Sequence, residues 1–129
     1  MSSITITTVT ALAIAVAAAA AVPVASAKGG DGVRVAGVCT QNSSAKLKLS
    51  REDGRIEVEF EVDQNRNGVP WKVTLRRNGA LVASTTARTH APSGSFSVRR
   101  LIARALATDR ITAVATRSSG ERCTARVAF

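Results

Sequence analysis

The clearest pattern in the chain is a strict alternation of apolar and acidic residues between Arg55 and Asp63. Because successive side chains of a β-strand point to opposite faces, this segment is predicted to be a half-buried strand. Its apolar side consists of Ile56, Val58, Phe60 and Val62, and its acidic side of Glu57, Glu59, Glu61 and Asp63. A helical period of 3.6 residues would scatter the acids around the axis. The pattern therefore predicts a sheet with one buried face.

The segment before this strand alternates in the same way and predicts a hairpin. Leucine alternates with lysine from Lys46 to Ser50, and Asp53-Gly54 is a strong signal for a two-residue turn. The pairs that this turn brings together are Leu49 with Val58 and Leu47 with Phe60 in the core, and Lys48 with Glu59 and Lys46 with Glu61 outside. Both faces match in one register, so we expect cross-strand ion pairs on the outer face.

A second hairpin is predicted after the loop that follows Asp63. Trp71 to Leu75 alternates again, and Asn78-Gly79 is another two-residue turn signal. The turn leads into a strand over residues 80–88, in which Val82 is expected to lie opposite Leu75.

The C-terminal part of the chain predicts two elements of different kinds. Phe96 and Val98 are expected to point inward from one strand. Residues 101–108 have no strand alternation and contain good helix formers, so a helical turn is expected there. Residues 109–117 and 122–127 form the last predicted hairpin.

Short, regularly spaced strands joined by turns are typical of an all-β fold built as a two-sheet antiparallel sandwich. The pattern resembles an immunoglobulin-like or fibronectin-III-like domain, with one tryptophan, Trp71, on the third core strand. Two hallmarks of antibody domains are missing, because neither cysteine lies on the bridged strands and the chain has no tyrosine. A flat meander of the same strands is the alternative topology.

The first 27 residues have no charged side chain and form an apolar run that ends in Ala25-Ser26-Ala27. Small residues at these positions are typical of a secretory signal peptide, so residues 1–27 are predicted to be cleaved. The segment before the apolar run has no Lys or Arg, and an uncleaved signal anchor is the alternative. We expect residues 28–129 to form a single secreted β-sandwich domain without a membrane span.

The chain has two cysteines, Cys39 and Cys123. In an exported protein an even number of cysteines indicates disulfides, and two cysteines allow one pairing. Such a bond would tie the N-terminal segment to the last strand. Two free buried thiols are the alternative.

The net charge of +9 is concentrated in the second half of the chain. Residues 28–69 contain seven bases and seven acids, whereas residues 70–129 contain eleven bases and two acids. This excess indicates an anionic partner such as a wall polymer, a lipid headgroup or nucleic acid. A compositional bias is the alternative, since Arg outnumbers Lys 14 to 4. The candidate anion-binding surface consists of Lys72, Arg76, Arg88, Arg99, Arg117, Arg122 and Arg126.

One loop matches part of a calcium-binding motif. Residues 63–68 fit the first six positions of an EF-hand-type loop, with oxygen ligands from Asp63, Asn65 and Asn67. Position 12 is Thr74, which cannot supply the bidentate carboxylate of that motif. The same residue types are usual in ordinary loops, which is the favoured interpretation, and no metal or other cofactor is expected.

The sequence does not provide a catalytic constellation. His90 is the single histidine, and no glycine pattern marks a nucleophile elbow. The aromatic residues of the basic half, Trp71, Phe96 and Phe129, are assigned to the core. A dedicated nucleic-acid surface, which needs exposed aromatics for stacking, is therefore not predicted.

Four runs of the chain resemble a group of small secreted proteins of actinomycetes that has no assigned activity. The runs are Gly54–Gly68, Trp71–Gly79, Ala91–Phe96 and Gly120–Cys123, and the similarity covers most of residues 28–129. The resemblance supports export, the disulfide and the sandwich, and implies no catalytic residues.

We expect a non-enzymatic secreted interaction domain at or near the cell envelope that binds an anionic polymer through its basic half. The alternative is a secreted inhibitor or effector that binds another protein through a rigid loop, Thr89 to Ser95.

Overall fold

The computed structural model describes residues 32–129, so the predicted signal peptide lies outside the described residues. The described part forms strands only. Its elements are β1 (Gly32–Ala36), β2 (Val38–Cys39), β3 (Ser44–Glu52), β4 (Arg55–Asp63), β5 (Pro70–Arg77), β6 (Ala80–Arg88), β7 (Ser95–Ala103), β8 (Arg110–Thr116) and β9 (Arg122–Ala128).

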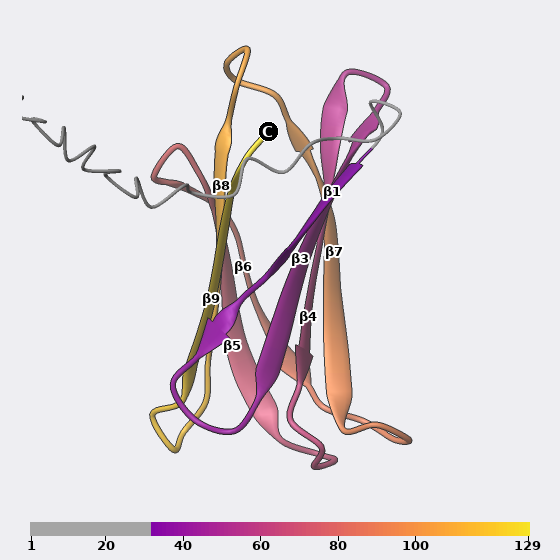
Figure 1. The fold of residues 1–129 in the computed structure, drawn as a ribbon, viewed down its shortest axis with the longest axis vertical. Coiled ribbons are helices and arrows are strands. Elements are labelled where there is room, and N and C mark those ends of the chain that lie inside the picture. Colours follow the sequence, from indigo (N-terminus) through magenta and orange to yellow (C-terminus); the bar gives the residue numbers. More distant parts are fainter. Residues whose placement is uncertain (1–31) are drawn as a thin grey trace, which may run out of the picture.

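The strands form two antiparallel sheets that pack face to face (Figure 1). One sheet has four strands in the order β1-β3-β4-β7, and the other has five in the order β2-β9-β8-β5-β6. The predicted two-sheet sandwich is confirmed, and the flat meander is wrong.

The core lies between the sheets and consists of the apolar side of each alternating strand. In the β3–β4 hairpin, Leu49 lies opposite Val58 and Leu47 opposite Phe60, and all four side chains are fully buried. The predicted register of this hairpin is confirmed. Trp71 on β5 is fully buried in the core and contacts Phe96 of the opposite sheet, with ring centroids 6.1 Å apart.

Two expectations about local structure are wrong. Leu75 lies opposite Ala83 rather than Val82, because a β-bulge shifts the β5–β6 register between Leu75 and Arg76. The helical turn at residues 101–108 does not form. Strand β7 continues to Ala103 because Ile102 is buried beside Ile56, and an irregular loop then leads to β8.

The N-terminal segment crosses from one sheet to the other. Strand β1 pairs with β3, and β2 pairs with β9 across the sandwich. The chain crosses at Gly37, where a Cβ would lie 2.9 Å from that of Ala45. Cys39 then lies directly opposite Cys123, and the predicted disulfide between them is confirmed.

Candidate anion-binding face

Five of the seven bases predicted to bind anions lie on the outer face of the five-stranded sheet. They are Lys72 and Arg76 on β5, Arg88 at the end of β6, and Arg122 and Arg126 on β9. They share this face because they alternate with core residues such as Val73 and Ala125. The sequence analysis missed Arg110, which lies on the same face at the start of β8, two positions before Thr112.

Strand pairing arranges four of these bases in two rows. Thr116 of β8 pairs with Lys72 on one side and with Arg122 on the other. Thr112 pairs in the same way with Arg76 and Arg126. We call Lys72, Arg76, Arg122 and Arg126 the basic grid.

The dimensions of the basic grid follow from sheet geometry. Bases within a row are two strands apart, which is about 10 Å. The two rows are four residues apart along the strands, which is about 13 Å. Between them runs an uncharged row of Thr74, Val114 and Thr124. Lys72, Arg76 and Arg122 line a shallow hollow of about 280 Å³ over this part of the sheet.

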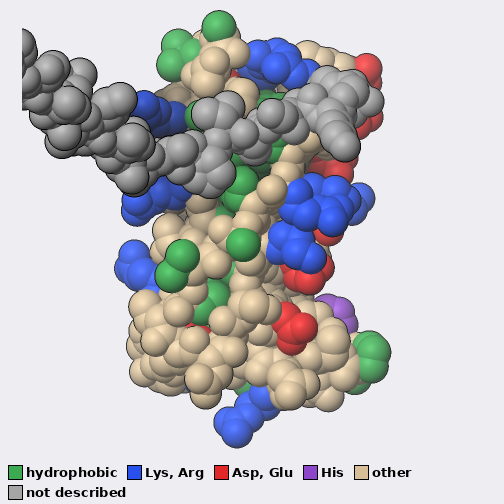
Figure 2. All heavy atoms as spheres, viewed as in Figure 1, with side chains coloured by type: hydrophobic (Ala, Val, Ile, Leu, Met, Phe, Trp, Pro, Cys, Tyr) green, Lys and Arg blue, Asp and Glu red, His purple; other side chains and the backbone are tan. Residues whose placement is uncertain are grey.

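Within residues 32–129, no outward-facing acid of this sheet balances the positive charge of the face. The outward positions of β5, β6, β8 and β9 contain no Asp or Glu. The ion pairs among the described residues involve Arg99 and Arg117 and none of the basic grid. In Figure 2, basic side chains occur along the side formed by β8 and β9, whereas basic and acidic side chains lie together along the side formed by β3 and β4.

Arg99 lies on the outer face of the other sheet, apart from the basic grid. Its guanidinium is 2.9 Å from Glu59 and 3.5 Å from Glu57. The hydrogen bond to Glu59 raises the pKa of Arg99, and the same bond holds the pKa of Glu59 below its ordinary value. The expected ion pairs of Lys48 with Glu59 and of Lys46 with Glu61 do not form within 4.0 Å. Glu59 lies between Lys48 and Arg99 in the sheet, and it accepts a hydrogen bond from Arg99 instead of pairing with Lys48.

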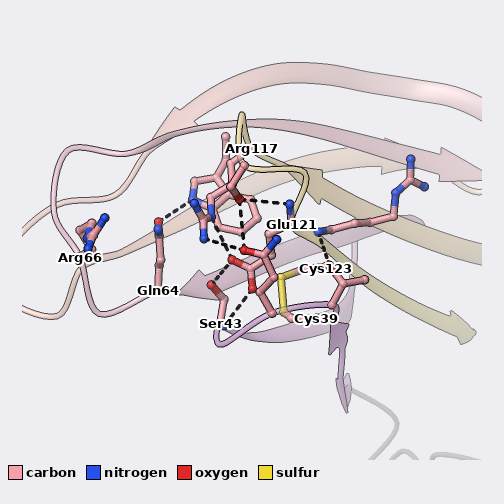
Figure 3. Close-up of polar contacts among 12 residues, drawn as sticks. Cys39, Ser43, Gln64, Arg66, Arg117, Glu121 and Cys123 are labelled. Carbon is pink, nitrogen blue, oxygen red and sulfur yellow. Dashed lines mark hydrogen bonds and ion pairs between the residues drawn. A yellow bond between two sulfur atoms is a disulfide. The ribbon is translucent and has the colours of Figure 1, made fainter.

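Arg117 is also engaged elsewhere, in a buried cluster at the end of the β8–β9 hairpin (Figure 3). Its Nε donates to the carboxylate of the fully buried Glu121 at 2.9 Å, and its guanidinium lies 5.6 Å from the Trp71 ring centroid. Ser43 donates to the same carboxylate through its backbone N–H at 3.0 Å and its hydroxyl at 2.9 Å. Burial raises the pKa of Glu121, but these donors together hold that pKa below its ordinary value.

The loop considered for calcium is organised by its own side chains. Asp63 Oδ1 accepts a hydrogen bond from the backbone N–H of Asn65 at 3.0 Å, and Asn65 has a φ of 59°. This arrangement is typical of an Asx turn in an ordinary loop. Within residues 32–129, one group of three potential metal-ligating side chains lies close together, namely Cys39, Glu121 and Cys123, and its two sulfurs form the disulfide.

The loop from Thr89 to Ser95 is fixed against the loop that follows β4. The Thr89 hydroxyl donates to the carbonyl of Arg66 at 2.6 Å and accepts from the N–H of Val69 at 2.9 Å. The carbonyl of Gly94 accepts from the N–H of Gln64 at 3.0 Å. His90 is exposed, and its Nδ1 lies 3.3 Å from the carbonyl oxygen of Arg88.

Comparisons with known protein families, with curated proteins and with solved structures found no match for the chain. Within the described residues, no helix is long and apolar enough to cross a membrane. The assignment of a function therefore depends on the geometry of the chain itself, and above all on the unpaired bases of the five-stranded sheet.

Proposed function

We propose that the protein is a non-enzymatic, secreted interaction domain that binds an anionic polymer at the cell envelope through the outer face of its five-stranded sheet. The single observation behind this proposal is the basic grid, four bases in two rows on a sheet face to which the described strands contribute no acid. Each row places a threonine hydroxyl between two cations, so an oxyanion there can meet two charges and one hydroxyl donor.

The shape of the face favours a polymer over a small molecule. Small ligands bind in concave pockets that enclose most of their surface, whereas this site is the open face of a sheet. A flexible chain with repeated charges can contact both rows at once and release counterions along its length. The aromatic residues Trp71, Phe96 and Phe129 are buried in the core. A polymer recognised through backbone charges therefore fits better than one recognised by base stacking.

The proposal includes an immunoglobulin-like fold of the fibronectin-III-like kind. The strand order supports it if β3, β4, β5, β7, β8 and β9 correspond to strands A, B, C, E, F and G. Strand β5 then pairs with β8, and β8 with β9, as C, F and G do in immunoglobulin sandwiches. Trp71 lies on the strand that corresponds to C, which is its usual place.

The disulfide supports a location outside the cytoplasm, because such bonds persist in oxidising compartments. In fractionated cells, we expect the protein in the envelope fraction and its release by high salt. Free release into the medium at low salt would contradict envelope binding.

The test of the face itself is a four-site variant of the basic grid, with each base replaced by Gln. Its matched control replaces four bases on the outer face of the other sheet, Arg34, Lys46, Lys48 and Arg55, and changes the net charge equally. Binding to heparin and to inorganic polyphosphate is measured between 50 and 300 mM salt. We expect the slope of log K against log salt to be shallower by about 3 in the grid variant, since each lost contact removes about 0.7–0.9.

The control variant should lose much less of this slope. Equal losses in both variants would attribute binding to net charge and would refute a specific face. The absence of binding to either polyanion would refute the proposal as a whole.

A second candidate function is binding of another protein through the loop from Thr89 to Ser95. The observation that favours it is the fixation of this loop by Arg66, Val69 and Gln64, because a pre-organised loop loses little entropy on binding. Pull-down from the medium of the producing cells at 1 M salt tests it. A partner captured by the native protein and lost in His90→Ala would support this candidate, and capture that fails at high salt would count against it.

A further inference from the structure

The loop between β7 and β8 presents an apolar tip at one end of the molecule. Ala105, Leu106 and Ala107 are consecutive and exposed, and 59% of Leu106 is accessible to solvent. The loop projects beyond the sheets at the end where the chain terminates, and hydrophobic side chains are visible at its tip (Figures 1 and 2). A single exposed leucine is ordinary, but this one is distinguished by the way it is held and by the charges around it.

The apolar tip is held outward by a buried carboxylate. Asp109 is fully buried, and its side chain accepts hydrogen bonds from the backbone N–H groups of Ala105 and Leu106, both at 3.0 Å. The Asn78 amide donates to the same carboxylate at 2.8 Å. The backbone of Asp109 is paired with Phe129 in both directions at 2.9 Å. The loop is thus clamped at its base, and Leu106 is not folded back onto the core.

Cations surround the base of the tip. Arg104 precedes it and donates to the carbonyl of Ala107 at 3.0 Å, and Arg110 follows Asp109 directly. Arg77 reaches the same region and donates to the carbonyl of Ala103 at 2.6 Å. Between residues 64 and 120 the sequence has one acid, Asp109, whose carboxylate is used inside the loop.

Besides Asp109, the acids that residues 32–129 place at this end belong to the neighbouring β3–β4 hairpin. Glu52 and Asp53 lie there between Arg51 and Arg55, and Arg55 pairs with Ala103 at the start of the loop. Their charges are matched one for one by these two arginines. Burial raises the pKa of the Asp109 carboxylate, but its hydrogen bonds and the nearby charge of Arg77 hold that pKa below its ordinary value. Around the apolar tip, three arginines and one aspartate therefore leave a local excess of two positive charges.

We propose that this end of the molecule docks onto an anionic phospholipid bilayer, with Leu106 inserted among the lipid headgroups and Arg77, Arg104 and Arg110 against the phosphates. A narrow, convex tip with one large apolar side chain is too small for a stable protein interface, which buries about 800 Å² per partner. A bilayer accepts a single inserted side chain, and anionic lipid attracts the flanking bases. Arg110 also lies on the sheet face of the basic grid, but Leu106, Arg77 and Arg104 do not, so insertion of the tip does not depend on the proposed polymer binding.

The test measures partitioning of the secreted protein onto vesicles of phosphatidylcholine containing 30% phosphatidylglycerol. Vesicles of phosphatidylcholine alone serve for comparison. Leu106→Ser should lower the partition coefficient on anionic vesicles about tenfold or more. Leu81→Ser is the matched control, because Leu81 is similarly exposed, at 52%, but lies on the sheet face. It should change binding less than twofold. Arg104→Gln should lower binding about fivefold, as expected for one base at an anionic surface.

A second measurement reports insertion directly. In Leu106→Trp, the new indole should be quenched by bilayers containing brominated lipid. The native protein serves as the control, because its one tryptophan, Trp71, is fully buried and should stay unquenched. Absence of quenching in Leu106→Trp would overturn insertion.

The outcomes separate this proposal from polymer binding. Leu106→Ser should leave heparin binding unchanged, and the basic-grid variant should keep the Leu106-dependent part of vesicle binding. Vesicle binding that is lost in the basic-grid variant and unaffected by Leu106→Ser would show that the sheet face takes the lipid, and it would overturn the role of the tip. No binding of the native protein to anionic vesicles would overturn it as well.

Discussion

Replacing Glu121 by alanine should destabilise the protein strongly, although the residue lies in a hairpin at the end of the sandwich. The carboxylate is fully buried and accepts one hydrogen bond from Arg117 and two from Ser43. Its removal leaves the Ser43 N–H without an acceptor and Arg117, whose side chain is 19% exposed, without its counter-charge. Breaking a buried pair in this way costs about 3–5 kcal/mol. Because Arg117 keeps some contact with water, we expect the low end, about 3 kcal/mol.

The assay is urea unfolding at pH 7 with the disulfide intact, followed by the fluorescence of the buried Trp71. Glu57→Ala is the control, because Glu57 forms a surface ion pair with Arg99 at 3.5 Å, which should contribute less than about 1 kcal/mol. A loss in Glu121→Ala that is no larger than in this control would refute a structural role for the buried carboxylate.

The same residue predicts a pH dependence. Because the pKa of Glu121 in the folded protein is below its ordinary value near 4.5, the carboxylate contributes stability at pH values above 4.5. This contribution is lost as the pH falls through the folded pKa. The difference in unfolding free energy between the native protein and Glu121→Gln should therefore be constant from pH 7 to 5 and shrink below pH 4.5. A difference that grows on acidification would contradict this sign.

Two further substitutions test the packing of the loops and the covalent link. Gly94→Ala should lower the unfolding free energy by about 2–4 kcal/mol in urea titrations, because its φ is 68° and the new Cβ would lie 2.7 Å from the backbone of Asn65. Gly54→Ala, with a φ of 75° and open space, should lose only about 1 kcal/mol, and equal losses would refute the steric argument. Replacing Cys39 and Cys123 by serine should lower the melting temperature and cost about 2–5 kcal/mol; an unchanged temperature would show that strand pairing alone holds β2.

The sequence predicts a strand register well where the side chains on both faces of a hairpin specify the same pairing. In the β3–β4 hairpin, leucines fit apolar residues on one side while lysines lie opposite glutamates on the other, so a slip of one residue would violate both patterns. The outer face of the β5–β6 hairpin has no charge pattern that specifies the register, because β6 is uncharged from Ala80 to Ala87. Nothing local then reveals the bulge at Leu75 and Arg76.

The sequence predicts part of the candidate face, because alternation with core residues determines which side chains point outward. Alternation with core residues places Lys72, Arg76 and Arg126 outward, whichever strand lies beside them. The engagement of Arg117 depends on Glu121, whose other partner Ser43 is 78 positions away in sequence. Contacts between residues so far apart in sequence arise from the packing of the two sheets, so no local sequence pattern predicts them.

The disulfide also determines how the molecule would respond to mechanical force. Cys39 and Cys123 are 84 positions apart, and in sequence the bond lies near both ends of the described domain, seven residues after Gly32 and six before Phe129. If the chain is pulled from its two ends, tension passes through the sulfur atoms and bypasses everything between them. At about 3.3–3.6 Å per residue, close to 300 Å of contour length stays hidden from the load. Under tension the part of the sandwich between the two cysteines would thus add no length to the chain.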